Sequence, residues 1–205
     1  SASKLEAVLR WRGRNERLLS SHRFQEASDL RVIGFDVAGR PLLYQCARNQ
    51  LLQNSKGLDQ YVVRMVQAID MMPPGVSTMT HIWDMHGMRM LLNLNPNAVL
   101  QLLSVLEGYF AERMHELIIV DVPQVAQFLV EAIWPAVPER TRKKVFFLSA
   151  KDALLHLEES CAPALTAQIG ALVERNRDPA CSLEERRNDW KQVDVSEVPN
   201  PLMGS

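Results

Sequence analysis

Two short runs that are almost entirely apolar constrain the fold of this chain more than any other feature. They are LIIVDV at residues 117–122 and KVFFLS at residues 144–149. A strand with one face in water alternates apolar and polar residues, whereas a continuous apolar run predicts a strand that is covered on both faces. Pro123 follows the first run and starts a helical pattern that ends near Pro135. We therefore expect a strand–helix–strand unit of a parallel sheet.

The rest of the chain alternates between the same two kinds of segment. β-branched and aromatic residues between turn signals predict strands at residues 32–35, 42–47 and 77–84. Helical patterns, mostly with apolar residues at a period of 3.6, predict helices at residues 3–19 (with a break near Gly13), 58–72, 95–110 and 150–174, and a short polar helix is predicted at residues 182–191. The expected fold class is α/β, with a mixed and mostly parallel sheet flanked by helices.

Charge and composition exclude several classes of function. The 205 residues carry a net charge of −1, so no overall field attracts the molecule to nucleic acid. No apolar run approaches the ~20 residues of a membrane span. Cys46, Cys161 and Cys181 form no CxxC pair, and we interpret them as reduced thiols of a cytoplasmic protein. Because the chain does not begin with methionine, we expect a longer parent protein whose other domains would be partners.

Two motifs share features with catalytic or metal-binding signatures but do not fit them. GFDVAGRP at residues 34–41 has the glycine spacing of a phosphate loop, yet Arg and Pro stand where Lys and Ser or Thr are required, so a hairpin is predicted. His81, Asp84 and His86 carry metal-ligating groups, but residues 81 and 84 of a strand point to opposite faces. We predict a buried His81, a strand-end Asp84, no metal and no cofactor. In the absence of other catalytic motifs, the sequence argues against an enzyme.

A cluster of cations adjoins the second apolar run. Arg140, Arg142, Lys143 and Lys144 lead directly into residues 145–148. Such a cluster is usually a solvated surface. The alternative is that one of the four cations faces something other than solvent, because the apolar run that it adjoins is typical of a core.

From about Trp11 to Ala171, the chain resembles the CRAL-TRIO lipid-binding domain, especially the phosphatidylinositol/phosphatidylcholine transfer proteins of that family. The matching stretches are WR (11–12), GFDVAGRPLL (34–43), IWDMHGM (82–88), FAERMHELIIVDVP (110–123), PERTRKKVFFL (138–148) and LTAQIGA (165–171). The resemblance implies a mixed sheet that encloses an apolar lipid pocket with a mobile gate helix at residues 124–137. The implied division is a remnant of an N-terminal helical region, the lipid-binding domain and a flexible tail, at residues 1–20, 21–191 and 192–205.

The resemblance also implies roles for individual residues. Those expected to line the pocket or its gate are Met79, His81, Val125, Phe128, Leu129, Ala132 and Ile133. Those expected to hold a lipid headgroup are Glu112, Thr141 and Lys144, because an ammonium suits a phosphate and the other two can bond inositol hydroxyls. The alternative is a structural Glu112–Lys144 ion pair. The cations expected to face a membrane are Arg140, Arg142 and Lys143, and the expected hinge is Gly170 and Ala171.

These inferences lead to an expected function. We expect a non-enzymatic domain that binds a phospholipid, above all phosphatidylinositol, and exchanges it with membranes. The implied partners are that lipid and a transient membrane surface, and the implied location is cytoplasmic with peripheral membrane association. One alternative is a carrier of a retinoid or tocopherol. Another is an interaction module of a larger signalling protein whose pocket is filled by Met79, Trp83, Met85 and Met90. A hydrolase that uses His81 or His86 is a remote third.

Overall fold

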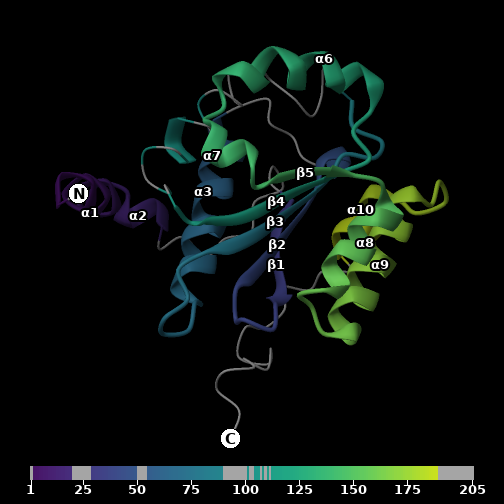
Figure 1. The fold of residues 1–205 in the computed structure, drawn as a ribbon, viewed down its shortest axis with the longest axis horizontal. Coiled ribbons are helices and arrows are strands. Elements are labelled where there is room, and N and C mark those ends of the chain that lie inside the picture. The colour runs from purple at the N-terminus through teal and green to yellow at the C-terminus, as the bar shows by residue number, and fades with distance from the viewer. Residues whose placement is uncertain are drawn as a thin grey trace, which may run out of the picture.

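The protein folds around one mixed sheet of five strands whose spatial order follows the chain, β1-β2-β3-β4-β5 (Figure 1). The computed structural model describes residues 2–19, 29–49, 55–89, 101, 104–106, 108, 110 and 112–188. The strands are β1 (Leu30–Phe35), β2 (Pro41–Cys46), β3 (Met79–Asp84), β4 (Met114–Val120) and β5 (Val145–Leu148). β1 and β2 are antiparallel, and the other neighbours are parallel. The predicted fold class is therefore confirmed.

Helices lie on both sides of the sheet. They are α1 (Ala2–Arg14), α2 (Glu16–Leu19), α3 (Ser55–Asp70), α6 (Gln124–Ile133), α7 (Glu139–Arg142), α8 (Ala150–Glu158), α9 (Pro163–Arg177) and α10 (Leu183–Asn188), with 3₁₀ turns η1 (Ala47–Asn49) and η2 (Trp134–Ala136). The predicted break near Gly13 falls at Asn15, between α1 and α2. Most of the helix predicted over residues 95–110 lies outside the described residues.

The predicted hairpin replaces any phosphate loop between β1 and β2. One carboxylate oxygen of Asp36 accepts hydrogen bonds from the backbone N–H groups of Ala38 and Arg40, at 2.9 and 2.8 Å. Gly39 adopts a positive φ of 76° there, which an L side chain rarely tolerates. This turn holds β1 and β2 in register at one end of the sheet.

One face of the sheet is sealed by α8 and α9. Tyr44, Ile82, Ile118 and Phe146 lie level with one another across β2 to β5. The first three are at most 2% exposed and pack against the buried side chains of these helices. Burying each such side chain contributes roughly 1.5–3 kcal/mol, so this layer is the main core of the domain.

The opposite face is covered unevenly. Leu43, His81, Leu117 and Val145 form its matching row. Leu43 and His81 are buried near α3, whereas Leu117 and Val145 remain half-exposed. Helix α3 therefore covers the β1–β3 half of this face and leaves the β4–β5 half less protected.

Strand β5 corrects one prediction from the sequence. Its apolar run predicted a strand covered on both faces, but it lies at the edge of the sheet, where Phe147 is 41% exposed. Composition describes what a strand can bury, whereas the position in the sheet decides what covers it. An exposed apolar edge strand is a candidate contact surface. The segment that lies over it, α6 with η2, is therefore described next.

Candidate functional site

Helix α6 and η2 form an arch between the end of β4 and the start of α7 (Figure 1). The start of this arch packs on the body of the domain, where Ala126 is buried with Ala47 and Met88, and Met85 and Val122 pack around them. Pro123 precedes α6 and provides no side-chain cap. The described contacts thus attach the arch to the sheet near its first turn.

Phe128 corrects another expectation. It was expected to line a pocket, but it lies on the outside of α6 with 78% of its surface exposed. It follows the buried Ala126 by two residues, which is about 200° around the helix. The other gate residues predicted on α6 have side chains outside the described part of the structure: Val125, Leu129, Ala132 and Ile133.

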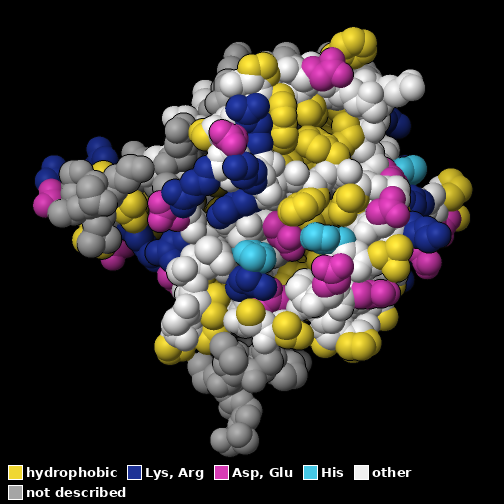
Figure 2. All heavy atoms as spheres, in the orientation of Figure 1, with side chains coloured by type: hydrophobic (Ala, Val, Ile, Leu, Met, Phe, Trp, Pro, Cys, Tyr) yellow, Lys and Arg dark blue, Asp and Glu magenta, His cyan; other side chains and the backbone are white. Residues whose placement is uncertain are grey.

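The half-covered part of the sheet beneath the arch is apolar. The ring of Trp134 meets that of Phe147 edge-on, with 5.4 Å between the centroids. Figure 2 shows hydrophobic side chains gathered between α6 and β5. We call Leu117, Trp134, Val145 and Phe147 the apolar patch. Its combination of exposure and apolar character is typical of a surface that contacts another molecule.

Cations of and after α7 lie next to the apolar patch, as Figure 2 shows. Arg140 pairs with Glu112 at 3.1 Å, and Lys143 pairs with Glu139 at 3.0 Å. All four side chains are more than two-thirds exposed. Exposed ion pairs contribute little free energy and exchange partners readily, so Arg140 and Lys143 remain accessible to another anion.

The other two cations of this cluster are less exposed. Arg142 was expected on the surface, but it is half-buried, and its Nε atom is buried with no hydrogen-bond acceptor in the described part of the chain. It lies about 200° around α7 from Arg140, which explains why the two face different surroundings. Lys144 is half-buried, and its ammonium donates to the backbone carbonyl of Met114 at 2.7 Å.

The predicted headgroup residues do not converge in this structure. Glu112 is turned to Arg140, and Lys144 is turned to the carbonyl of Met114, so the alternative of a structural Glu112–Lys144 ion pair is wrong. Thr141 is half-buried in α7. Lys144 and Thr141 therefore stay near the edge of the apolar patch, while Glu112 stays in solvent.

His81 is buried, as predicted, with 4% of its surface exposed. Its Nδ1 lies 3.5 Å from the hydroxyl of Tyr61. Burial lowers the pKa of His81 to about 4, so the ring is neutral at pH 7. Burial also raises the pKa of Tyr61, which the adjacent indole of Trp83 partly offsets. Met79 is fully buried in the same layer. His81 and Tyr61 are therefore polar side chains packed inside an apolar core.

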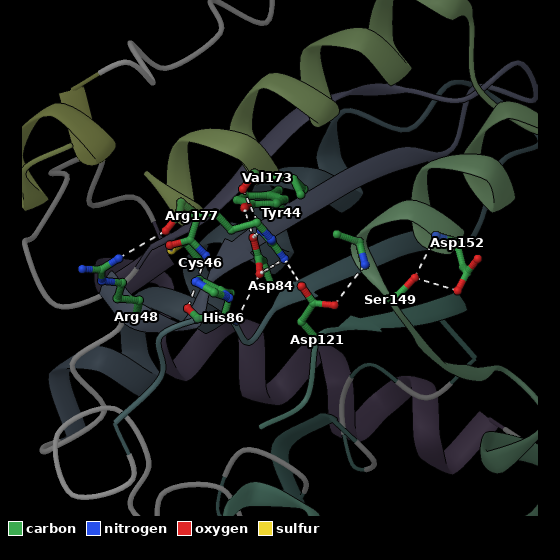
Figure 3. Close-up of polar contacts among 12 residues, drawn as sticks. Tyr44, Cys46, Arg48, Asp84, His86, Asp121, Ser149, Asp152, Val173 and Arg177 are labelled. Atoms are coloured by element: carbon green, nitrogen blue, oxygen red, sulfur yellow. Dashed lines mark hydrogen bonds and ion pairs between the residues drawn. The ribbon is translucent and has the colours of Figure 1, made fainter. Parts of the chain in front are cut away.

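A polar network that was not predicted from the sequence joins the carboxyl ends of β3 and β4 to α9 (Figure 3). Arg177 donates to Asp84 at 2.9 and 3.3 Å and to Asp121 at 2.5 Å. Asp84 is completely buried and also accepts from the hydroxyl of Tyr44 at 2.9 Å and from the backbone N–H of His86. Arg177 thus fastens two strand ends to one helix.

This network alters the ionisation of its members. Burial pulls the pKa of Arg177 down, but its hydrogen bonds to Asp84 and Asp121 outweigh burial and raise that pKa above its usual value. Burial, and then the charge of Asp84, raise the pKa of Tyr44. Burial raises the pKa of the nearby Cys46 thiol to about 12. The arginine is therefore permanently charged, whereas the phenol and the thiol stay protonated.

Asp121 connects the network to the arch. It follows β4 directly, adopts a positive φ of 49°, and accepts a hydrogen bond from the N–H of Ala150 at the start of α8. Helix α6 begins three residues later, at Gln124. Asp121 is therefore bonded to both α8 and α9, and it fixes the position from which the first turn of the arch starts.

The structure also locates the residues that the sequence suggested as metal ligands and as a hinge. His81 and Asp84 lie on opposite faces of β3, and the described residues contain no group of three side chains suited to a metal ion. Gly170 and Ala171, expected as a hinge, lie inside the continuous helix α9, where Gly170 packs near Leu154. Within the described residues, no helix has the length and apolarity to cross a bilayer.

The fold and site define a class of mixed-sheet α/β domains in which a helical arch stands over a half-covered apolar face. Three comparisons with known proteins agree with this fold class. The family model described as CRAL/TRIO domain matches residues 30–170. A CRAL-TRIO domain-containing protein of Schizosaccharomyces pombe is 26% identical over 122 residues, which cover 59% of this chain and 12% of that protein. The crystal structure of Sfh5 matches with a TM-score of 0.58 and 18% identity, covering 72% of this chain and 59% of that one.

The chain belongs to the CRAL/TRIO domain family, whose members bind lipids. It spans about an eighth of the yeast relative and about three-fifths of the Sfh5 chain. The likeness to Sfh5 shows the fold. Lipid binding in general follows from the family, and the apolar patch beneath α6 is the candidate site for it.

Proposed function

We propose that this domain binds a phospholipid, phosphatidylinositol, beneath the α6 arch and exchanges it with membranes without catalysing a reaction. The observation that carries the proposal is the half-covered apolar patch with cations at its border. Acyl chains need apolar walls, because each buried methylene contributes roughly 0.8 kcal/mol against water. A membrane and such a site are similar solvents for these chains, which makes exchange between them nearly neutral in free energy.

The cations support an anionic headgroup. Lys144 has one described acceptor for its three N–H donors, and the buried Nε of Arg142 has none. A buried donor without an acceptor is costly, and a lipid phosphate at the edge of the apolar patch would offset that cost. Thr141 lies on the same short helix and offers a hydroxyl to an inositol ring.

A second candidate is an interaction module without a lipid. It is favoured by Met79, which is fully buried against α3, and by Met85, which packs with Ala126. Both side chains occupy space on the face of the sheet that lies under α3 and α6. Native mass spectrometry of protein from cells that contain phosphoinositides separates the two candidates. A bound phospholipid supports the first, and a lipid-free protein supports the second.

Replacement of Lys144 with alanine tests the headgroup site. We expect loss of phosphatidylinositol transfer with a small change in the melting temperature of the lipid-free protein. The variant removes one half-buried hydrogen bond to the carbonyl of Met114, which contributes about 1 kcal/mol. Lys151→Ala is the matched control, because Lys151 is exposed on α8 and belongs to neither the headgroup site nor the membrane-facing cations. Unchanged transfer by Lys144→Ala would place the headgroup elsewhere.

Exchange of the two exposed cations, Arg140 and Lys143, for glutamine tests membrane contact. Each cation near an anionic surface contributes about 1 kcal/mol, and salt screens the attraction. We therefore expect lipid transfer to slow more from anionic vesicles than from neutral ones, with the difference shrinking at high salt. Lys151→Gln, an exposed change on α8, serves as the control. Equal slowing on both kinds of vesicle would exclude a docking role for these cations.

A further inference from the structure

The outer edge of β5 carries backbone groups that point away from the sheet. β5 has β4 on one side and no strand of the described chain on the other. The N–H of Leu117 donates to the carbonyl of Lys144 at 2.8 Å. In a parallel ladder only alternate residues of a strand bond to a given neighbour, so the even-numbered residues of β5 face β4. The N–H and C=O groups of Val145 and Phe147 therefore face outward.

These outward groups form no backbone hydrogen bond within the described residues. In Figure 2, the place that β5 occupies in Figure 1 is a band of white, the colour of backbone, between groups of hydrophobic side chains. Proline, a charged side chain or a bulge ordinarily keeps an edge from pairing, and β5 contains none of these. With Phe147 41% exposed, this edge can accept another strand.

β5 is complementary to a second copy of itself in the antiparallel direction. If two copies meet with Phe146 opposite Phe146, then Val145 of each copy faces Phe147 of the other. Two residues that face each other with outward N–H and C=O groups exchange two hydrogen bonds. Both pairs form without disturbing β4, and their apolar side chains cover one another on the face of the sheet.

The charges at the two ends of β5 match in the same register. Residues 139–144 carry four cations and one carboxylate. Lys143 would lie opposite Ser149 of the other copy, and the Ser149 hydroxyl is 2.6 Å from a carboxylate oxygen of the exposed Asp152. The ion pair of Lys143 within α7 is exposed and exchanges partners readily. Lys151 lies about 100° around α8 from Asp152, so it faces another direction.

We propose that this chain forms a weak two-fold dimer through the β5 edge, in which the sheets of the two copies join into one. Two-fold dimers are the commonest oligomers, and they use the same surface on both copies. A strand of four residues gives an interface near or below the ~1,200 Å² of small stable complexes, so we expect a dissociation constant in the micromolar range. The inference does not rest on the proposed lipid function, and its tests use lipid-free protein.

Amide hydrogen exchange at increasing protein concentration tests the pairing residue by residue. Protection of the Val145 and Phe147 amides should rise with concentration, because these N–H groups gain acceptors in the dimer. The amides of Phe146 and Leu148 are the internal control, since they bond to β4 in the monomer and should be protected throughout. Sedimentation over the same concentrations should show a monomer–dimer equilibrium.

Charge reversal tests the register. Lys143→Glu and Asp152→Lys should each weaken dimerisation about tenfold or more, because two-fold symmetry reverses the contact twice. An equal mixture of the two variants should form a mixed dimer with the affinity of the wild type, because each facing pair is again opposite in charge. Glu158→Lys, an exposed reversal at the other end of α8, is the matched control and should dimerise like the wild type.

A wild-type protein that stays monomeric at millimolar concentration would overturn the proposal, and so would one whose β5 edge binds only an extended peptide of another protein. A dimer that leaves the Val145 and Phe147 amides unprotected would also overturn it. The same holds for a dimer that neither charge reversal weakens, because that dimer would use another surface.

Discussion

Arg177→Met is expected to lower the free energy of unfolding by about 3 kcal/mol or more. The variant leaves Asp84 as a completely buried carboxylate with the Tyr44 hydroxyl and one backbone N–H as its donors. Removing one partner of a buried ion pair costs about 3–5 kcal/mol, because the other charge stays desolvated. Urea unfolding at pH 7 measures the change.

A double variant separates a stranded charge from a general packing defect. Asp84→Asn combined with Arg177→Met should recover a substantial part of the lost stability, because the buried charge of Asp84 is then removed together with its partner. Arg175→Met is the matched control on the same helix, since Arg175 is exposed. A single variant as stable as the wild type, or a double variant no better than the single one, would contradict the assigned role of Arg177.

Asp121 extends this prediction to the arch. Its φ of 49° is tolerated by Asn but costly for a β-branched residue. Asp121→Asn should therefore retain the backbone and lose part of the ion pair, whereas Asp121→Val should also disturb the start of α6. If the arch admits the lipid, Asp121→Val should change the rate of lipid exchange by a larger factor than its stability loss explains.

Acidification from pH 7 to pH 5 is expected to cost about 2 kcal/mol of stability through His81 alone. Its pKa is about 4 in the folded protein and about 6.5 when unfolded. Below pH 6.5 the unfolded state therefore binds a proton that the folded state refuses, so stability falls as the pH falls toward 4. The contribution is fully present above the unfolded pKa.

The measurement is urea unfolding at both pH values for the wild type and His81→Leu. Between pH 7 and pH 5 the free energy of unfolding of the variant should fall by about 2 kcal/mol less than that of the wild type. Its stability at pH 7 is compared separately, because the variant also loses the contact with the Tyr61 hydroxyl. Lys151→Gln, an exposed change on α8, is the control, because it leaves His81 unchanged. The same pH dependence in the wild type and His81→Leu would show that His81 takes up a proton while folded.

The sequence predicted the sheet well because apolar runs and turn signals are local. β3 ends at Asp84 as expected, and β4 contains the LIIV run. The sequence did not reveal that β5 is an edge strand, since Val145 to Leu148 have the same composition at an edge as in a centre. Phe128 was misplaced for a related reason: an apolar residue on a helix indicates a face, not what covers it.

The Arg177 network was missed because its members are far apart in the chain. Arg177 is 93 residues from Asp84 and 56 from Asp121. A signal was present, however. Asp84 ends one strand and Asp121 follows the next, and adjacent parallel strands bring such carboxylates to the same edge of the sheet. Two neighbouring carboxylates at a covered sheet edge require a cation, which an arginine on a covering helix can supply.

The path of α9 determines where the chain can be cut. The family match ends at residue 170, but the helix continues to Arg177 and carries the buried Val173 and Asn176 beyond that point. A fragment that stops at residue 170 would expose Tyr44 and Ile82 on one face and leave Asp84 without its cation. Limited proteolysis should accordingly leave α9 uncut in the native protein, and the shortest fragment that folds should extend past Arg177.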